Sequence, residues 1–167
     1  MAFQSLHWLA ASLRQRGDHA DADTELARAL DLCERAGLVA QSVEAISSRA
    51  VNLALAGRTD AAREAAEEAE RLADRLRYPV GKAASLEARG AAASDTGESS
   101  AALEEAREAW QALGRPLDAA RCEYLRGRLL READPAQARE ALENAASEAE
   151  RYGVHHLAEL ARELMPA

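Results

Sequence analysis

The chain has 167 residues, of which 48% are hydrophobic and only 4% aromatic, and its formal net charge is -8. This length suits one domain or a short array of repeats, and a core built mostly from alanine and leucine favours closely packed helices over a sheet sandwich. The acidic balance argues against direct binding of nucleic acid or anionic lipid, because such binding depends on clustered lysine and arginine.

Cellular location is predicted from cysteine usage and hydropathy. Cys33 and Cys122 are isolated from each other and from histidine, a pattern typical of small buried hydrophobic residues in a reducing compartment. No stretch approaches the roughly 20 apolar residues of a membrane span, and residues 1–15 do not have the pattern of a signal peptide. We therefore expect a cytoplasmic protein that does not interact with membranes.

Hydrophobic periodicity and punctuation by glycine and proline predict helices along the whole chain. These helices are expected at residues 3–15, 20–36, 40–56, 60–77, 80–94, 99–113, 117–132, 136–152 and 155–164. Alternation of β-branched and aromatic residues, the usual pattern of a strand, is not sustained anywhere. The predicted fold class is all-α.

Turn residues separate the expected helices at regular places. Glycine at a helix end supplies the left-handed conformation that satisfies the last carbonyls, and it is expected in this role within the first three helix pairs at Gly17, Gly57 and Gly97. In the last pair, Asp134, Pro135 and Gln137 indicate an N-cap, a proline at the first helical position and a capping-box glutamine. Between pairs come Gly37, Tyr78 with Pro79, Gly114 with Pro116, and Gly153.

Small residues recur with the spacing i, i+4, i+7, which places them on one face of a helix. The four sets are Ala22, Leu26 and Ala29; Ala62, Ala66 and Ala69; Ala102, Ala106 and Ala109; and Ala138, Leu142 and Ala145. Eleven or twelve positions before each set stands another small residue: Ala10, Ala50, Gly90 and Gly127. This repetition predicts units of helix, turn and helix that pack closely at the small residues.

The arrangement resembles the tetratricopeptide repeat, in which small residues at fixed places let neighbouring helices pack closely. The resemblance divides the chain into four units and a capping helix, near residues 1–38, 39–78, 79–114, 115–153 and 154–165. It implies a right-handed α-solenoid, although the period exceeds the usual value of about 34 residues, and HEAT or armadillo arrays are the alternative. Similar long-period repeats occur in bacterial transcriptional regulators and signalling ATPases, so the resemblance implies a protein- or peptide-binding scaffold or sensor.

The resemblance also places the first helix of each unit on a concave binding surface. In the fourth unit this surface would carry Arg121, Tyr124, Arg128 and Arg131, a stripe that suits an acidic or carboxylate-bearing partner. The first two units would add His7, Arg14, Glu44 and Ser47. The alternative for the arginine stripe is a solvated surface paired with acids of the neighbouring unit.

Three further arginines stand immediately before the small residue of their unit: Arg49, Arg89 and Arg126. They could form a ladder across the repeats. The alternative is a structural role, in which their aliphatic parts cover apolar surface and their guanidinium groups pair with acids of adjacent helices.

Trp8 is the candidate for an interface at the N-terminal end. Leu6, Leu9, Ala10 and Leu13 define the predicted inward stripe of the first helix, and at 100° per residue Trp8 points away from it. The alternatives to a lone exposed aromatic residue are a self-association surface, a partner site or contact with a preceding repeat.

Catalytic and metal sites are not predicted. An acidic cluster comprises Asp18, His19, Asp21, Asp23 and Glu25, but it lacks the glycine and distal glutamate of a calcium-binding loop, and acids near a helix start favour the helix dipole. His155 and His156 are adjacent and diverge on a helix. Because no recognised catalytic motif occurs, we expect neither enzymatic activity nor a cofactor.

Overall fold

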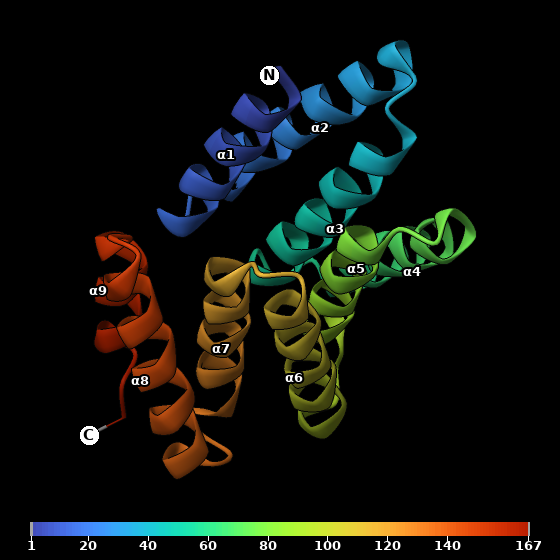
Figure 1. The fold of residues 1–167 in the computed structure, drawn as a ribbon. Coiled ribbons are helices and arrows are strands. Elements are labelled where there is room, and N and C mark those ends of the chain that lie inside the picture. Colours follow the sequence, from blue (N-terminus) through green and yellow to red (C-terminus); the bar gives the residue numbers. More distant parts are fainter. Residues whose placement is uncertain (1, 167) are drawn as a thin grey trace. The chain divides into compact units, whose positions relative to one another are not determined.

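The computed structural model describes residues 2–166, and in that range it is built of nine α-helices without a strand (Figure 1). In chain order they are α1 (Ala2–Gln15), α2 (His19–Ala36), α3 (Val39–Leu55), α4 (Thr59–Leu76), α5 (Pro79–Ala92), α6 (Thr96–Ala112), α7 (Pro116–Leu130), α8 (Pro135–Arg151) and α9 (His155–Glu163). The all-α class is confirmed, and every helix boundary lies within three residues of its expected position.

The chain divides into two compact units, Met1–Ala93 and Ser94–Ala167. The first unit contains α1 to α5, and the second contains α6 to α9. The division falls within the third unit expected from the sequence, residues 79–114.

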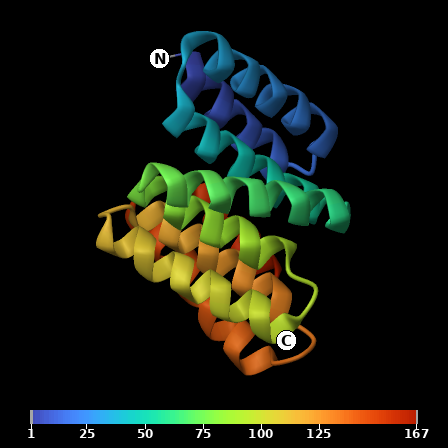
Figure 2. The ribbon, with the colours of Figure 1, turned by 90° about the vertical axis from the view of Figure 1, so that its right-hand side faces the viewer.

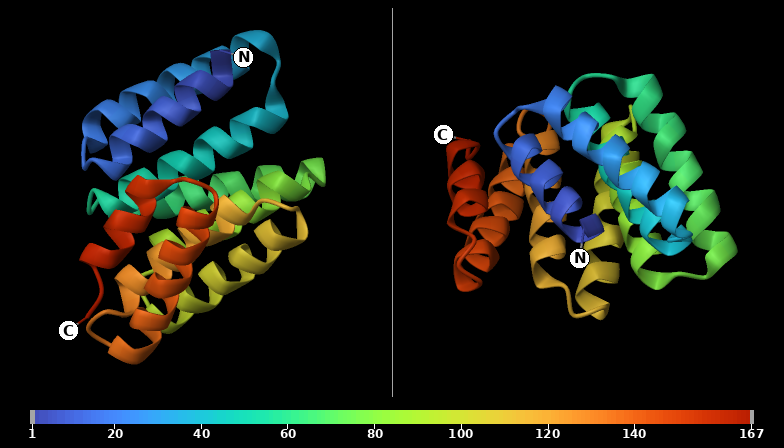
Figure 3. Two further views of the ribbon diagram at one scale, coloured as in Figure 1. Left: turned by 60° about the vertical axis from the view of Figure 1, so that its left-hand side comes forward. Right: turned by 90° about the horizontal axis from the view of Figure 1, so that it is seen from above.

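Helices that follow one another in the chain pack against each other within both units. In the first unit α3 is the central helix, because it contacts α1, α2, α4 and α5 (Figure 2). In the second unit α7 packs between α6 and α8, and α9 covers α8 (Figure 3). This succession of neighbouring helices is the packing that an all-α repeat fold requires.

The small residues found by periodicity lie where helices meet. Of the twelve residues in the four sets, eleven are buried, and so are Ala10, Ala50, Gly90 and Gly127. The exception is Ala109, which is partly exposed because the neighbouring Trp110 takes the buried place. Arg115 lies over the Trp110 ring at 4.7 Å from its centre.

Gly127 shows why a small residue is needed. A Cβ atom at this position would lie 2.5 Å from Cγ of Leu142 and 3.1 Å from the carbonyl oxygen of Ala138, both on α8. The first distance is shorter than real Cβ atoms show and the second is tighter than most of their contacts, so α7 and α8 approach at this point to a distance that suits glycine.

The helix ends follow the predicted punctuation with one correction. Gly17 and Gly57 adopt the left-handed conformation, with φ of 83° and 76°. Gly97 was expected to end a helix but lies in the first turn of α6. The expectation was wrong because Asp95 caps this helix, its Oδ1 accepting a hydrogen bond from the Glu98 amide at 2.8 Å.

The cap predicted for α8 is confirmed. Oδ1 of Asp134 accepts a hydrogen bond from the Gln137 amide at 3.0 Å, and Pro135 occupies the first helical position. The Gln137 side chain donates from Nε2 to Oδ2 of Asp134 at 2.7 Å. The second hydrogen bond of this capping box therefore joins two side chains. Across residues 2–166, every helix is too short or too polar to cross a membrane.

Candidate functional site

Two exposed arginines lie at the C-terminal end of α7. Arg128 and Arg131 lie three residues apart on one face of this helix, Arg131 directly after its last residue. Neither guanidinium is paired with an acid among the described residues. These two members of the predicted stripe therefore keep their hydrogen-bond donors available at the surface.

The other two members of that stripe are engaged in the structure. Arg121 donates from Nη1 to Oδ1 of Asp118 at 2.8 Å, and Arg115 donates from Nε to Oδ2 of the same carboxylate at 2.7 Å. Burial raises the pKa of Asp118, but the two arginines outweigh it and hold this pKa below its ordinary value. Tyr124 packs against the apolar core that α7 forms with α8 and α9.

The residues predicted for the surface of the first two units differ in accessibility. Arg14 is buried, and its Nη1 donates to the carbonyl oxygen of Ser48 at 3.1 Å and to Oγ of Ser48 at 2.9 Å. This pair ties α1 to α3, so Arg14 serves packing and is not presented to a partner. Ser47 is also buried, with only 2% of its surface exposed. Both placements depart from the exposed surface expected from the sequence.

His7 and Glu44 are half-buried and have neighbours of their own. The ring of His7 lies 5.7 Å from the ring of Phe3 on the same helix. Glu44 on α3 accepts a hydrogen bond from the Tyr78 hydroxyl at 2.7 Å. The four residues therefore do not gather into one exposed surface in the first unit.

Arg49, Arg89 and Arg126, which precede the repeated small residues Ala50, Gly90 and Gly127, pair with acids of neighbouring helices. This is the structural role that the sequence offers as one of two alternatives. Each lies on the first helix of a hairpin and pairs with an acid on the helix before it: Arg49 with Asp23 at 2.7 Å, Arg89 with Glu70 at 3.3 Å and Arg126 with Glu104 at 2.8 Å. The pairs join α3 to α2, α5 to α4, and α7 to α6. The interpretation that these guanidinium groups pair with acids of adjacent helices is confirmed.

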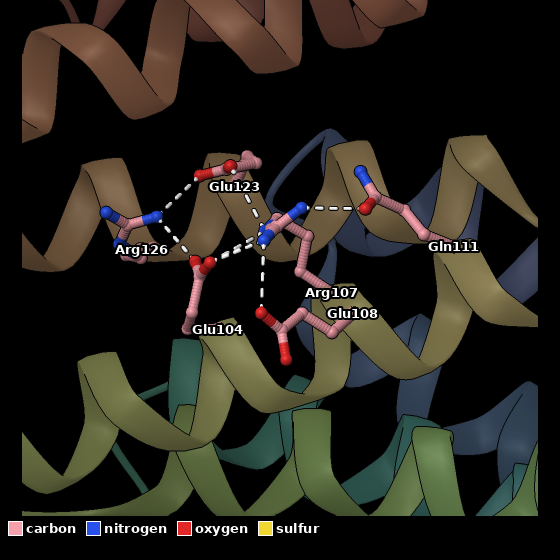
Figure 4. Close-up of polar contacts among 6 residues, drawn as sticks. All are labelled: Glu104, Arg107, Glu108, Gln111, Glu123 and Arg126. Atoms are coloured by element: carbon pink, nitrogen blue, oxygen red, sulfur yellow. Dashed lines mark hydrogen bonds and ion pairs between the residues drawn. The ribbon is translucent and has the colours of Figure 1, made fainter.

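Arg126 belongs to a polar network between α6 and α7 that sequence reasoning missed (Figure 4). Nη1 of Arg107 donates to Oε1 of Gln111 at 2.8 Å, and Nε of Arg107 donates to Oε1 of Glu104 at 3.1 Å. Glu123 of α7 lies 3.6 Å from Arg107 and accepts a hydrogen bond from Arg126 at 3.1 Å. The network alternates positive and negative groups across the helix interface.

The two network acids have opposite pKa shifts. The hydrogen bond from Arg107 lowers the pKa of Glu104, against a smaller opposing effect of burial. Burial raises the pKa of Glu123, and the nearby Glu104 adds to the rise in spite of Arg126 and Arg107. Glu123 is therefore the acid in this network that takes up a proton more readily.

A hollow of about 300 Å³ opens beside this network, between α6, α7 and α8. Its polar lining comprises Arg107, Gln111, Glu123, Asn144, Ser147 and Glu148, and the remaining surface comes from Pro116 and two alanines of α7. At 100° per residue, Glu123 points about 140° away from Arg128 around the axis of α7. No spacing in the sequence indicates this hollow, because its lining comes from three helices.

Trp8 points outward as predicted, with 67% of its surface exposed. Leu9, expected on the inward stripe, is 47% exposed. The inward stripe instead begins at Phe3 and continues through Leu6, Ala10 and Leu13. Because the buried stripe of α1 includes Phe3, it lies on a slightly different face of the helix from the one expected. Leu9 therefore lies with Trp8 on the exposed face.

The acidic cluster at the start of α2 is used within the first unit. Asp23 pairs with Arg49, Glu25 pairs with Arg28 at 2.8 Å, and Nδ1 of His19 lies 3.0 Å from Oδ1 of Asn52. Among residues 2–166, no three His, Cys, Asp or Glu side chains are placed to hold one metal ion. Both cysteines are buried.

Comparison of the chain with protein-family models and with curated proteins gave no match.

Proposed function

We propose that the chain is a non-catalytic helical-repeat module that binds a protein or peptide segment rich in carboxylates. The observation that carries this proposal is the pair Arg128 and Arg131, exposed and without an acidic partner in the described chain. Most other arginines of the described chain pair with acids, whereas Arg128 and Arg131 lie three positions apart with both guanidinium groups free of an acid. Guanidinium groups bind carboxylates with two parallel hydrogen bonds, which gives such a surface specificity.

The wider role follows from the resemblance to tetratricopeptide repeats. We propose that the hairpins belong to a right-handed solenoid of this type and serve a bacterial transcriptional regulator or signalling protein in the cytoplasm. The support is the succession of neighbouring helices and the burial of small residues at the repeated positions. Function is not determined by fold, so the arginine pair remains the basis of the binding proposal.

A second candidate function is sensing of a small ligand in the hollow between α6, α7 and α8. Its volume of about 300 Å³ is at the lower end of ligand sites, and its lining offers both donors and acceptors. A small molecule bound there would raise the melting temperature of the wild type. The same molecule would not stabilise an Asn144→Leu, Ser147→Leu variant, which replaces two polar residues of the lining by larger apolar ones.

The test of the main proposal compares partner capture by three immobilised forms of the protein. One is the wild type, one is Arg128→Glu, Arg131→Glu, and one is a control, Arg58→Glu, Arg75→Glu. The control arginines are also exposed and unpaired but lie in the first unit. Both variants change the net charge by the same amount, and their helicity and melting temperature are checked against the wild type.

The proposal predicts that a protein retained from a native lysate by the wild type and by the control is lost by the α7 variant. Its binding should also weaken with salt, since exposed charges are screened. Equal capture by all three forms would contradict a role for Arg128 and Arg131. Arg121 is left unchanged because its loss would also remove a partner of Asp118.

A further inference from the structure

The outward face of α1 is exposed and uncharged. Its exposed residues include Gln4, Ser5, Trp8, Leu9 and Ser12, which lie on one side of the helix. Trp8 and Leu9 expose 67% and 47% of their surfaces. Two large apolar residues side by side at this exposure make the centre of an apolar patch.

Comparison of α1 with α3, the equivalent helix of the next unit, shows what this face of α1 is shaped to contact. The counterparts of Ser5, Leu9 and Ser12 in the next unit, 40 positions later, are Ala45, Arg49 and Asn52 of α3. All three are turned towards α2, the helix before α3.

Each of these contacts is direct. Ala45 is fully buried in a cluster with Ala29 and Cys33, Arg49 pairs with Asp23, and Nδ2 of Asn52 donates to the His19 carbonyl at 2.9 Å. The same face of α1 is therefore shaped to receive a helix. At the position where α3, α5 and α7 carry Arg49, Arg89 and Arg126, α1 carries Leu9. A helix that packs on α1 therefore needs an apolar surface there and not a carboxylate.

The charge distribution favours a second copy of the chain as the source of that helix. A protein of net charge -8 repels its own copies over most of its surface. Every described helix carries at least one acid except α1. The only arginine of α1, Arg14, is buried. Two copies can thus approach through α1 without bringing carboxylates together.

The order of residues on this face is self-complementary. Ser5 lies three positions before Trp8, and Ser12 lies three positions after Leu9. When two such helices run antiparallel, with a two-fold axis passing between Trp8 and Leu9, each Trp8 faces the Leu9 of the other copy. Each Ser5 then faces a Ser12, and the two small side chains allow the helices to approach.

From these observations we propose that the chain forms a symmetric dimer through the exposed face of α1, with the two α1 helices antiparallel. This goes beyond partner binding on α7, because it uses a different unit and a different chemistry. In the proposed dimer the patch around Trp8 and Leu9 contacts the same patch of a second copy of the chain. The centre of the interface is therefore apolar and uncharged.

The first test measures mass in solution over a range of concentrations, by light scattering or sedimentation equilibrium. The wild type should approach twice the 17.9 kDa of one chain as concentration rises. Leu9→Glu should remain monomeric, because it places two charges at the centre of the interface. Leu76→Glu, which adds the same charge at an exposed leucine of α4, should dimerise like the wild type.

Circular dichroism and melting temperature establish that both variants are folded, so that loss of dimer is separated from loss of structure. A wild type that is monomeric at every concentration up to the submillimolar range would overturn the proposal. Dimerisation of Leu9→Glu equal to that of the wild type would overturn it as well. Neither result depends on Arg128 or Arg131, so the proposed function stands or falls separately.

A second test fixes the orientation by disulfide cross-linking. Ser5→Cys and Ser12→Cys proteins of different size, one carrying a tag, are mixed and oxidised. The antiparallel arrangement predicts that the mixed product forms in preference to either product that joins identical positions. The wild type should give no product, because its two cysteines are buried. Preferential linking of Ser5→Cys to itself would contradict the proposed axis.

Discussion

Gly127 is a single residue whose side chain decides how closely two helices approach. Alanine normally stabilises a helix interior by about 1 kcal/mol relative to glycine. At this position the added methyl group would meet Cγ of Leu142 at 2.5 Å. We predict that Gly127→Ala lowers the free energy of unfolding, by about 1 to 3 kcal/mol, because overpacking outweighs the gain in helix propensity. Urea denaturation measures this change.

Gly97→Ala is the matched control, since this glycine also lies in a helix. The only close atom for its added methyl is Oδ1 of Asp95, at 3.2 Å, which caps α6 and needs to shift by only a few tenths of an ångström. It should cost much less than Gly127→Ala. The loss at Gly127 should also shrink in a Leu142→Ala background, where the clashing atom is absent. A Gly127→Ala protein more stable than the wild type would contradict the close contact.

Individual residues also show where sequence reasoning succeeds and where it stops. The need for a small residue at Gly127 could be read from its periodic position, but its contact Leu142 could not be inferred with certainty, because several α8 residues share that face. Leu9 was misplaced because the pattern allowed two inward stripes, and only packing of Phe3 against α2 and α3 selects one of them.

At the scale of elements, helix caps set the boundaries most firmly. The side chains of Asp95 and Asp134 each accept a hydrogen bond from the backbone amide three residues later. We predict that Asp95→Ala and Asp134→Ala each cost about 0.5 to 2 kcal/mol of stability. Thermal and urea unfolding of the two variants measure the cost.

The corresponding position of α4, Arg58, makes no side-chain cap, and Arg58→Ala serves as the control. It should change stability by less than either aspartate variant. Equal effects of all three substitutions would show that the caps contribute nothing of their own. The spacing of Asp134, Pro135 and Gln137 predicts the cap of α8, whereas Gly97 in the sequence indicates a turn and so hides the cap of α6.

The arginine pairs join neighbouring helices, but their contribution to stability should be small. Arg49 and Asp23 expose 39% and 25% of their side chains, so solvent screens their attraction. We predict that a double-mutant cycle with Arg49→Met and Asp23→Ala gives a coupling free energy below about 1 kcal/mol. The cycle for Arg126 and Glu123, which expose 18% and 10%, should give a larger value.

A larger coupling at Arg49 than at Arg126 would contradict this ordering. The arginines could be singled out from sequence because they stand at a fixed place in the repeat. Their acidic partners could not, since the separation along the chain is 26 residues for Arg49, 19 for Arg89 and 22 for Arg126. The hollow and the polar network beside it could not be predicted from the sequence for the same reason, because their residues come from helices that only the folded chain brings together.

For the molecule as a whole, the balance of 29 acidic against 21 basic residues makes stability depend on pH. Burial raises the pKa of Glu123, so the folded chain holds this proton more tightly than the unfolded chain does. The resulting stability is fully present below the unfolded pKa of about 4.3 and is lost as the pH rises through the folded value. Relief of the net negative charge acts in the same direction.

Asp118 and Glu104 act in the opposite sense. Burial opposes ionisation of Asp118, but Arg121 and Arg115 lower its pKa, and the hydrogen bond from Arg107 lowers that of Glu104. Their contribution is present above their unfolded pKa values and is lost as the pH falls through the folded values. The free energy of unfolding should therefore have its maximum on the acid side of neutrality and decline steeply at still lower pH.

Urea denaturation at a series of pH values between 3 and 8, spanning the ordinary carboxyl pKa values, tests this curve. Glu123→Gln should flatten the decline between the maximum and pH 7, because it removes the group whose folded pKa is raised. Asp118→Asn should leave that side unchanged and reduce the decline below the maximum. A wild-type curve that keeps rising through neutral pH, or a Glu123→Gln curve with the wild-type slope, would show that burial of Glu123 does not govern the neutral side.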